Sequence, residues 1–258
     1  MGQVPASSPA PGRTPFGFVG DGRLSRHWRH YFTSLGIPWK LWSRRLARAN
    51  GVAGTNAAVA LAECPVVLLA VADDAIAPVL ARLRAEGLDD RTFVHFCGGR
   101  SIAGAFGAHP LMSFGSTLYD AAFYRDIPVF VDDGPDHPDP VAYFQGLFPR
   151  LPNPCFKLRI EDKAYYHAIC ALAGGFTAVL WREFFETMEK RFDAPRAALA
   201  AYPRRIVENV IASADSALTG PVARGDTAMI RSHLAALDGS ALAEVYQAFI
   251  AAAGREHA

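Results

Sequence analysis

The sequence lacks a strong net charge of either sign, and it has few cysteines. Its 258 residues include 26 Lys and Arg against 25 Asp and Glu, a formal net charge of +1. Composition therefore gives no reason to expect nucleic acid or an anionic membrane surface as a partner. The four cysteines, Cys64, Cys97, Cys155 and Cys170, show no C-x-x-C spacing, which argues against a zinc site or a disulfide framework. We expect no metal and a reducing, cytoplasmic compartment.

Long hydrophobic runs are also scarce. Residues 1–15 contain Pro5, Pro9, Pro11 and Pro15 and lack the apolar core of a signal peptide, so we predict a disordered tail. Elsewhere we find no apolar run of the ~18 residues that a membrane helix needs. These absences predict a soluble protein without a membrane partner. Because 51% of the residues are hydrophobic and 20% are charged, the chain can still bury a full core.

A glycine turn follows the first apolar run. Gly20, Gly22 and Ser25 fall on the spacing G-x-G-x-x-G, with a strand predicted before Gly20 and a helix over 23–35. In this pattern the first glycine permits the tight turn, the second lets the backbone approach a pyrophosphate, and the third position needs a small residue. The N–H groups at the start of the helix, around Arg23 and Leu24, would face the phosphates. A simple turn is the alternative interpretation.

Short apolar runs then alternate with helical stretches, which is typical of a parallel sheet with crossover helices. Strands are predicted at 39–42, 65–71, 92–96, 128–131 and 155–158, and helices through 83 and over 140–148. In such folds ligands bind at the carboxyl edge of the sheet. Val71, Ala72 and Asp73 end one strand there and Cys97 ends the next, so we expect these residues to line the cofactor site. Asp73 or Asp74 is expected to cap the helix that follows.

The end of the strand at 39–42 points to the kind of dinucleotide. An NAD-binding unit would place an acidic residue about 20 positions after the glycine turn, to bind the ribose 2′-hydroxyl. Here the strand ends in Ser43, Arg44 and Arg45 instead. Two guanidinium groups and a hydroxyl suit a 2′-phosphate, so we predict NADP as the cofactor. A solvated basic loop is the alternative.

The sequence becomes helical after residue 160. Residues 161–192 contain no proline and predict one helix of about 48 Å. Gly174 and Gly175 lie in its middle, and we expect a ligand or a partner helix to approach closely there. Further helices are predicted at 195–217, 226–237 and 240–253. The apolar helix is too long for its own domain to cover, so we expect a homodimer built through these C-terminal helices.

Three residues are candidates for chemistry on a substrate. His109 precedes Pro110, which could aim its imidazole into the cleft. His167 lies two turns before Gly175, on the same helix face. Arg224 lies in the turn 218–226, where Gly220 and Pro221 force the bend and Asp226 caps the next helix. Arg224 has no such structural role, although it could be an ordinary surface arginine.

Several of these segments together carry a resemblance to a known family. They are Gly20-x-Gly22, LAVADD at 69–74, VHFCG at 94–98, HPLMSF at 109–114, YHA at 166–168 and LTGPVARGD at 218–226. Their order resembles a bacterial Rossmann-like family with a C-terminal domain of unknown function, in the 6-phosphogluconate dehydrogenase C-terminal-like superfamily. The layout is more distantly similar to ketopantoate reductase, prephenate dehydrogenase and pyrroline-5-carboxylate reductase. Gly174-Gly175 departs from the family, whose members usually show Ser-Asn there.

The resemblance implies an α/β fold in which an N-terminal Rossmann doubly wound sheet precedes an all-helical 6-phosphogluconate-dehydrogenase-like domain. We place the NADP-binding domain at 16–160 and the helical substrate and dimerisation domain at 161–258. The implied activity is an NADP-dependent oxidoreductase acting on a small, anionic metabolite. His109 or His167 would be the acid or base, Arg224 would bind a substrate carboxylate, and the site would lie between the domains. The alternative is a dinucleotide-binding protein that senses or sequesters the cofactor, which Ser25 and Gly175 favour.

Overall fold

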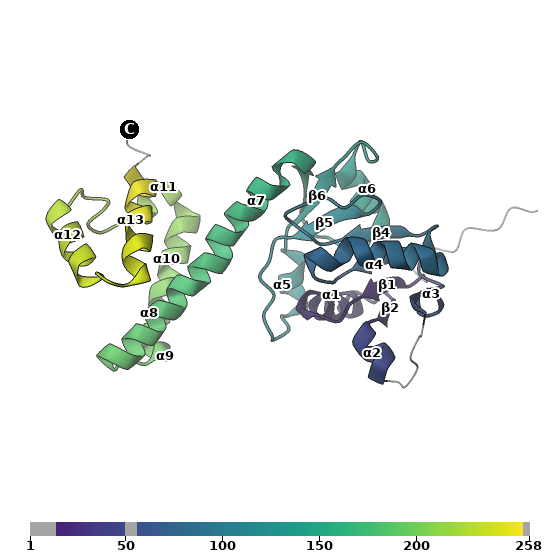
Figure 1. Ribbon diagram of the computed structural model, residues 1–258, viewed down its shortest axis with the longest axis horizontal. Helices are drawn as coiled ribbons and strands as arrows, with labels where there is room; N and C mark the ends of the chain where they lie inside the picture. Colours follow the sequence, from purple (N-terminus) through teal and green to yellow (C-terminus); the bar gives the residue numbers. More distant parts are fainter. Residues whose placement is uncertain (1–13, 50–55, 255–258) are drawn as a thin grey trace, which may run out of the picture. The chain divides into compact units, whose positions relative to one another are not determined.

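The computed structural model describes residues 14–49 and 56–254, in two compact units, Met1–Thr177 and Ala178–Ala258 (Figure 1). The tail predicted at 1–15 lies almost wholly outside the described residues. The division between the units falls within the long helical stretch Ile160–Phe192. Each unit is described by itself below.

The first unit is built on a seven-stranded sheet. Its strands are β1 (Phe16–Val19), β2 (Trp39–Trp42), β3 (Val66–Leu69), β4 (Thr92–His95), β5 (Phe106–Pro110), β6 (Val129–Asp133) and β7 (Cys155–Arg159). They lie in the order β2-β1-β3-β4-β5-β6-β7. All neighbours pair in parallel except β5 and β6, which pair antiparallel. The α/β doubly wound fold predicted from the sequence is confirmed.

Helices cover both faces of this sheet. The helices of this unit are α1 (Arg23–Ser34), α2 (Arg44–Ala49), α3 (Ala57–Ala60), α4 (Ile76–Leu83), α5 (Ala121–Arg125), α6 (Pro140–Leu147) and α7 (Lys163–Cys170). Successive side chains of a strand point to opposite faces, so Val66 and Leu68 pack with α1 and α6, whereas Val67 and Leu69 pack with α3 and α4. The fully buried β3 therefore explains the uninterrupted apolar run of the sequence.

The order of the strands reverses at β1, because β2 lies on one side of it and β3 on the other. Ligands of doubly wound sheets bind in the crevice at such a switch point, outside the carboxyl ends of the strands. The loops after β1, β2, β3 and β4 all leave at this edge. The topology thus brings together the four segments in which the sequence places the cofactor residues.

Several elements of this unit were not predicted. The strand β5, the short helices α3 and α5, and α2, which begins at Arg44, all lie in stretches for which no element was expected. The segment of β5, Phe-Gly-Ala-His-Pro, has little intrinsic preference for a strand. It is paired on both sides, with β4 and β6, so its neighbours determine its conformation.

The predicted helix at 161–192 is confirmed in outline but is not uniform. A 3-10 turn (Ile160–Asp162), α7, a π-helical segment (Ala171–Phe176) and α8 (Thr177–Phe192) follow one another without a break. The glycine pair lies in the π-helical segment. By length and composition the stretch could cross a membrane, with a mean hydropathy of 1.3 over 18 residues, which corrects the expectation that no such run exists. A single helix of this kind is weak evidence for a membrane protein.

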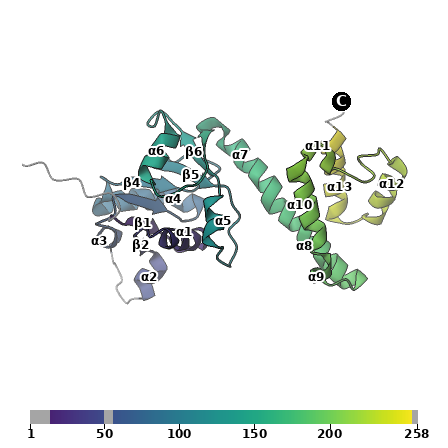
Figure 2. The same ribbon diagram turned by 180° about the vertical axis from the view of Figure 1, so that it is seen from behind.

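The second unit is wholly helical in the part that the structure describes. Besides α8 it contains α9 (Arg196–Leu199), α10 (Ala201–Ala212), α11 (Ala214–Ala217), α12 (Thr227–Ala236) and α13 (Ala241–Ala253) (Figure 2). The single helix predicted at 195–217 is wrong, because the chain forms three helices there. Trp181 and Phe184 of α8 pack against Tyr202 of α10. No described residue of this unit is buried.

Candidate functional site

The two glycines of the turn between β1 and α1 have different structural roles. Gly20 has a φ of +101°, and a Cβ built there would lie 2.3 Å from the carbonyl oxygen of Ala70. A side chain is therefore excluded by both the backbone conformation and the close approach of the segment after β3. Gly22 has an ordinary φ, and no atom lies within 4 Å of a Cβ built on it. Gly20 makes the turn possible, whereas Gly22 leaves open space in front of the backbone.

The start of α1 has the features of an anion site. Gly22 is its N-cap residue, no side chain caps it, and no acidic residue lies in its first turn. No capping side chain therefore accepts a hydrogen bond from the first N–H groups of the helix. These groups lie at the positive end of the helix dipole. Ser25 is fully buried, and its Oγ lies 3.3 Å from Nε of Arg29. A small residue is accommodated at the third position of the motif, as the sequence predicts.

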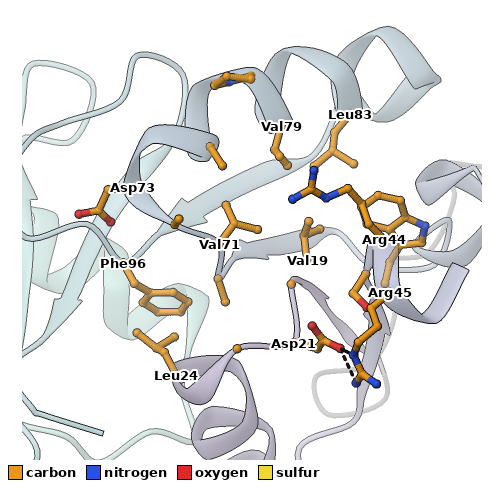
Figure 3. A pocket seen from close by; sticks show the side chains of 18 of the residues that line it. Val19, Asp21, Leu24, Arg44, Arg45, Val71, Asp73, Val79, Leu83 and Phe96 are labelled. Carbon is orange, nitrogen blue, oxygen red and sulfur yellow. Dashed lines mark hydrogen bonds and ion pairs between the residues drawn. The ribbon is translucent and has the colours of Figure 1, made fainter. Parts of the chain in front are cut away.

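A cavity of about 1030 Å³ lies over this turn, at the switch point of the sheet. Its lining includes these predicted cofactor residues: Gly20, Gly22, Arg23, Leu24, Ser43, Arg44, Arg45, Val71, Ala72, Asp73 and Cys97. Ser25 is the one predicted cofactor residue that does not line it. In Figure 3, Arg44 and Arg45 lie at one end of the cavity, and Asp73 and Phe96 lie at the other. The four carboxyl-edge loops therefore contribute to one elongated pocket.

The three residues after β2 have different surroundings. Ser43 is buried, and its Oγ accepts a hydrogen bond from the N–H of Leu46 at 3.2 Å, at the start of α2. The guanidinium of Arg45 pairs with the carboxylate of Asp21 at 2.6 Å (Figure 3). Arg44 is exposed and has no ion pair among the described residues. Arg44 is therefore the cation that remains available to an anionic ligand at this end of the pocket.

The predicted capping by Asp73 or Asp74 is wrong. Both residues lie in a 3-10 turn, Asp73–Ala75, that precedes α4, and neither α4 nor this turn has a side-chain cap. The turn shifts the start of the α-helix to Ile76, so the two carboxylates are not at its N-cap position. Asp73 instead accepts a hydrogen bond from Arg100 through its backbone oxygen.

The two candidate histidines lie together at the same edge of the sheet. His109 comes from β5 and His167 from α7, and their rings are perpendicular with centroids 5.8 Å apart. The loop after β4 passes beside them. A Cβ on Gly98 would lie 2.8 Å from Cδ2 of His167 and 2.9 Å from Nε2 of His109, so glycine is required where this loop meets the rings. Neither histidine lines the large cavity, but the loop connects them to Cys97, which does.

The surroundings of His109 keep its imidazole neutral. Burial, then the nearby His167 and Lys163, lower the pKa of His109 to about 4, against smaller opposing effects of Asp73 and Asp132. Its Nδ1 lies 2.9 Å from the hydroxyl of Tyr166. The group that the sequence proposes as an acid or base is thus an uncharged imidazole at neutral pH.

The sequence did not reveal a polar cluster near these rings, formed by Lys163, Asp132, His95 and the partly buried Ser101. The ammonium of Lys163 is 1% exposed and donates to the carboxylate of Asp132 and, at 3.0 Å, to the carbonyl oxygen of Cys97. The hydroxyl of Ser101 lies 2.6 Å from the other carboxylate oxygen.

His95 completes this cluster. Its Nδ1 accepts the N–H of Cys97 at 3.2 Å, and its Nε2 is buried without a partner, 3.9 Å from Asp132. Burial lowers its pKa to about 4. The cluster ties the start of α7 to β4 and β6. Gly107 is the one feature of the sequence that reflects this cluster. A side chain is excluded there, because a Cβ would lie 2.3 Å from the Asp132 carboxylate.

Arg224 belongs to the second unit. It is exposed, in the turn that Gly220 begins with a φ of +89°. The predicted cap is confirmed, since Asp226 accepts the N–H of Met229 at 3.0 Å. Arg224 has no ion pair within the described ranges, and its role stays a prediction. In those ranges no three His, Cys, Asp or Glu residues are grouped as metal ligands.

The fold of this chain is similar to those of several solved structures. A proposed NADP oxidoreductase from Bacteroides fragilis has a TM-score of 0.72 at 20% identity, covering 93% of this chain and 97% of its own. A reductive aminase from Aspergillus terreus, in complex with NADPH, has a TM-score of 0.57 at 16% identity, with 94% and 93% covered. Pyrroline carboxylate reductase from Plasmodium falciparum, with NADP bound, has a TM-score of 0.56 at 15% identity, with 95% and 97% covered. At these identities the likeness shows the fold.

Comparison of sequences identifies the C-terminal part. No curated protein shows significant similarity to the chain. Residues 128–253 match the family described as a domain of unknown function, DUF2520. The match begins at β6 in the sheet and extends to the end of α13. The resemblance stated from the motifs is confirmed: the chain combines an α/β doubly wound fold with a C-terminal part that matches the DUF2520 family.

Proposed function

We propose that this protein is an NADP-dependent oxidoreductase that acts on a small, anionic metabolite. The observation that carries the proposal is the pocket at the switch point, with a bare backbone at Gly22, an uncapped helix N-terminus and an arginine without a partner. These features fit two parts of NADP that need recognition, the pyrophosphate and the 2′-phosphate. The α1 N–H groups would bind the pyrophosphate, Gly22 would allow its close approach, and Arg44 would bind the 2′-phosphate.

The cofactor would supply the hydride, and the protein would supply orientation and a proton. Asp73 and Phe96 lie at the end of the pocket away from Arg44. Cys97 lines the pocket next to Gly98, which contacts the two histidines, so the nicotinamide would bind at this end. His109 and His167 are the groups able to donate to or accept from a substrate atom there. Arg224, from the second unit, would bind a substrate carboxylate, because its guanidinium is exposed and unpaired. The oxidoreductases with the same fold support this class of reaction.

Cofactor binding tests the first step. In titrations of intrinsic fluorescence, NADPH should bind more tightly than NADH. Arg44→Ala should weaken NADPH about 10- to 150-fold, since a hydrogen bond to a charged group contributes roughly 1.5 to 3 kcal/mol, and should leave NADH nearly unchanged. Arg45→Ala is the matched control, because Arg45 already pairs with Asp21. Equal or reversed affinities for the two cofactors would contradict the proposal.

Turnover separates the leading proposal from its alternative, a protein that binds the dinucleotide without using it. The glycine pair at 174–175 favours the alternative, because it offers no side chain to a substrate. NADPH oxidation should be assayed with a panel of small keto acids and cyclic imino acids. Tight, Arg44-dependent binding without oxidation of NADPH across the panel would favour the sensor or sequestering role.

A further inference from the structure

The ring of His109 has one nitrogen bonded within the protein and one open. Nδ1 faces the hydroxyl of Tyr166 at 2.9 Å. Nε2 lies on the side of Gly98, where it has no hydrogen bond to any described residue, yet it is not sealed from solvent as Nε2 of His95 is. The open nitrogen is therefore the one that a ligand could reach, and its protonation depends on what happens at Nδ1.

Tyr166 is held firmly in place. Its ring packs against Phe130, with centroids 4.8 Å apart, and edge-on to His109, with centroids 5.6 Å apart. Phe130 and His109 are themselves directly opposite each other on β6 and β5. Two adjacent strands thus fix the position of the tyrosine ring, and with it the 2.9 Å contact.

The direction of the hydrogen bond follows from the chemistry of the two groups. Burial, and then the charge of Cys170 and its hydrogen bond with the hydroxyl, raise the pKa of Tyr166, so the hydroxyl keeps its hydrogen at neutral pH. The sulfur of Cys170 is a weak acceptor compared with an imidazole nitrogen. A phenol O–H is a stronger donor than a neutral imidazole N–H, and an imidazole nitrogen is a stronger acceptor than a phenol oxygen. The hydroxyl should therefore donate to Nδ1, leaving the ring hydrogen on Nε2.

We propose that Tyr166 is a positioning residue that donates its hydroxyl hydrogen to Nδ1 of His109 and so holds this ring as the Nε2–H tautomer. His109 then presents a neutral N–H donor beside Gly98, suited to an oxygen or nitrogen acceptor such as a carbonyl or an imine. This assignment rests on the proposed function only for the identity of that acceptor.

The electrostatic surroundings support a neutral donor. The titratable groups facing His109 are Tyr166, His167 and Lys163 of α7, Asp132 of β6 and Asp73 of the turn before α4. Together with burial they leave its pKa at about 4. At neutral pH the ring therefore polarises an acceptor through a hydrogen bond and does not act as a cationic acid. The proton that completes a reduction would come from another group, of which His167 is the nearest candidate.

The tautomer can be measured without any cofactor or substrate. In the full-length protein labelled with 15N-histidine, long-range proton–nitrogen correlations distinguish Nδ1–H from Nε2–H, and a His109→Gln variant identifies the resonances of His109 among the eight histidines. We expect His109 to be the Nε2–H tautomer at pH 7. A hydrogen on Nδ1 in the unmodified protein would overturn the proposal, whatever any variant does.

Two neighbouring tyrosines provide a matched pair of variants. Tyr166→Phe removes the hydroxyl, so Nδ1 loses its donor and its nitrogen resonance should move toward that of a free acceptor. The neutral form loses a stabilising bond, and the pKa of His109 should rise by about one pH unit. Tyr165→Phe is the control, because Tyr165 is 74% exposed. An unchanged Nδ1 resonance and pKa in Tyr166→Phe would contradict the proposal.

Kinetics distinguish this proposal from the proposed function. If the protein reduces a substrate, Tyr166→Phe should lower kcat about 10-fold or more and change KM little, while Tyr165→Phe should leave both unchanged. If no substrate is reduced but the tautomer and the pKa respond as expected, the proposed function fails and the assignment of Tyr166 stands. If reduction is found and Tyr166→Phe leaves its rate unchanged, the positioning role fails.

Discussion

The two units of this protein bury their apolar side chains very differently. In Met1–Thr177 the sheet has a hydrophobic cluster on each face, and residues such as Phe18, Phe32 and Leu68 are fully buried. In the described part of Ala178–Ala258 no residue is buried, and large apolar side chains such as Ile211 and Phe249 are 81% and 55% exposed. The first unit closes a core within one chain, whereas the second does not.

The difference indicates that the second unit needs a partner to cover its exposed apolar side chains. Helices bury one face against another element, and a helical unit without a closed core leaves those faces for a partner. The π-helical segment and α7 continue the pattern, because Tyr165, Ile169, Leu172 and Phe176 are all exposed at helical spacing. A second copy of the chain, paired about a two-fold axis, is the occupant we expect, since isologous pairing is the commonest way to cover such faces.

The largest effect should come from placing charge on an apolar face of the second unit. Val207 and Ile211 lie one turn apart on α10 and are 52% and 81% exposed. We expect a dimer by light scattering at micromolar concentration. The double variant Val207→Glu and Ile211→Glu should raise the dimer dissociation constant more than a thousandfold, since burying unpaired carboxylates costs several kcal/mol.

The control for this variant is Arg205→Gln, on the same helix, where Arg205 makes only an exposed ion pair with Glu208. It should leave the dimer intact. A monomer in the unmodified protein would remove the second copy as the occupant, and binding to lipid vesicles would then be the next measurement, because of the long apolar helix.

The first unit should be most sensitive at its buried ion pair. Lys163→Met leaves the Asp132 carboxylate buried with only Ser101 as a partner, and the free energy of unfolding should fall by about 3 to 5 kcal/mol. Lys157→Met is the control, because Lys157 is half exposed and lies 3.9 Å from Asp133. Its effect should stay below about 1 kcal/mol. Urea unfolding measures both, and similar losses in the two variants would show that the cluster contributes little.

Acid should weaken the first unit in particular, because His95 and His109 both lie in it. Each has a pKa of about 4 in the folded protein, below the 6.5 of an unperturbed histidine. Between these values the unfolded chain binds more protons, so stability is fully present above pH 6.5 and falls as the pH drops toward 4. At pH 5 each histidine should account for a loss of roughly 2 kcal/mol.

Fluorescence can localise this loss. Trp28, Trp39 and Trp42 lie in the first unit and Trp181 in the second. Urea unfolding of a Trp181→Phe protein at pH 7.5 and pH 5 therefore reports on the first unit alone. His95→Gln should reduce the difference between the two pH values. A first unit equally stable at both would show that the histidines are not held neutral.

Most of the first unit could be predicted from the sequence, and the reasons are local. The apolar run at Val66–Leu69, the glycine turn and the residues after β2 follow rules of period, turn chemistry and charge that act over a few positions. The pocket lining followed from them, because a parallel sheet brings the carboxyl ends of its strands to one edge.

The features that were missed depend on long-range contacts. The strand β5 forms because β4 and β6 flank it. Asp132 and Lys163 meet across 31 positions of sequence, and nothing near either residue indicates the other. The same holds for Tyr166 and His109, 57 positions apart. Spacing can suggest which residue types carry chemistry, but it cannot show which nitrogen of a histidine is bonded.

The smallest effect is expected from the glycine pair in the helical stretch where the two units join. It tests whether a partner covers the apolar side chains of this stretch. Gly174 and Gly175 are both exposed, and no atom lies within 4 Å of a Cβ built on either. Among the described residues, no other part of the chain makes the close approach expected at this pair. Alanine should then stabilise the helix by up to about 1 kcal/mol at either position, because glycine is the weaker helix former.

A second copy packed on the apolar stripe formed by Tyr165, Ile169, Leu172 and Phe176 would make the two positions differ. Gly175 is next to Phe176 and three residues after Leu172, both of which belong to the stripe, whereas Gly174 lies toward the opposite side of the helix. Gly174→Ala should therefore raise the free energy of unfolding by about 0.5 to 1 kcal/mol, and Gly175→Ala should gain nothing or weaken the dimer, because its methyl group would meet the partner. Urea unfolding and light scattering on both variants decide the point. Equal stabilisation at both positions, with an unchanged dimer, would mean that the partner does not contact this part of the helix.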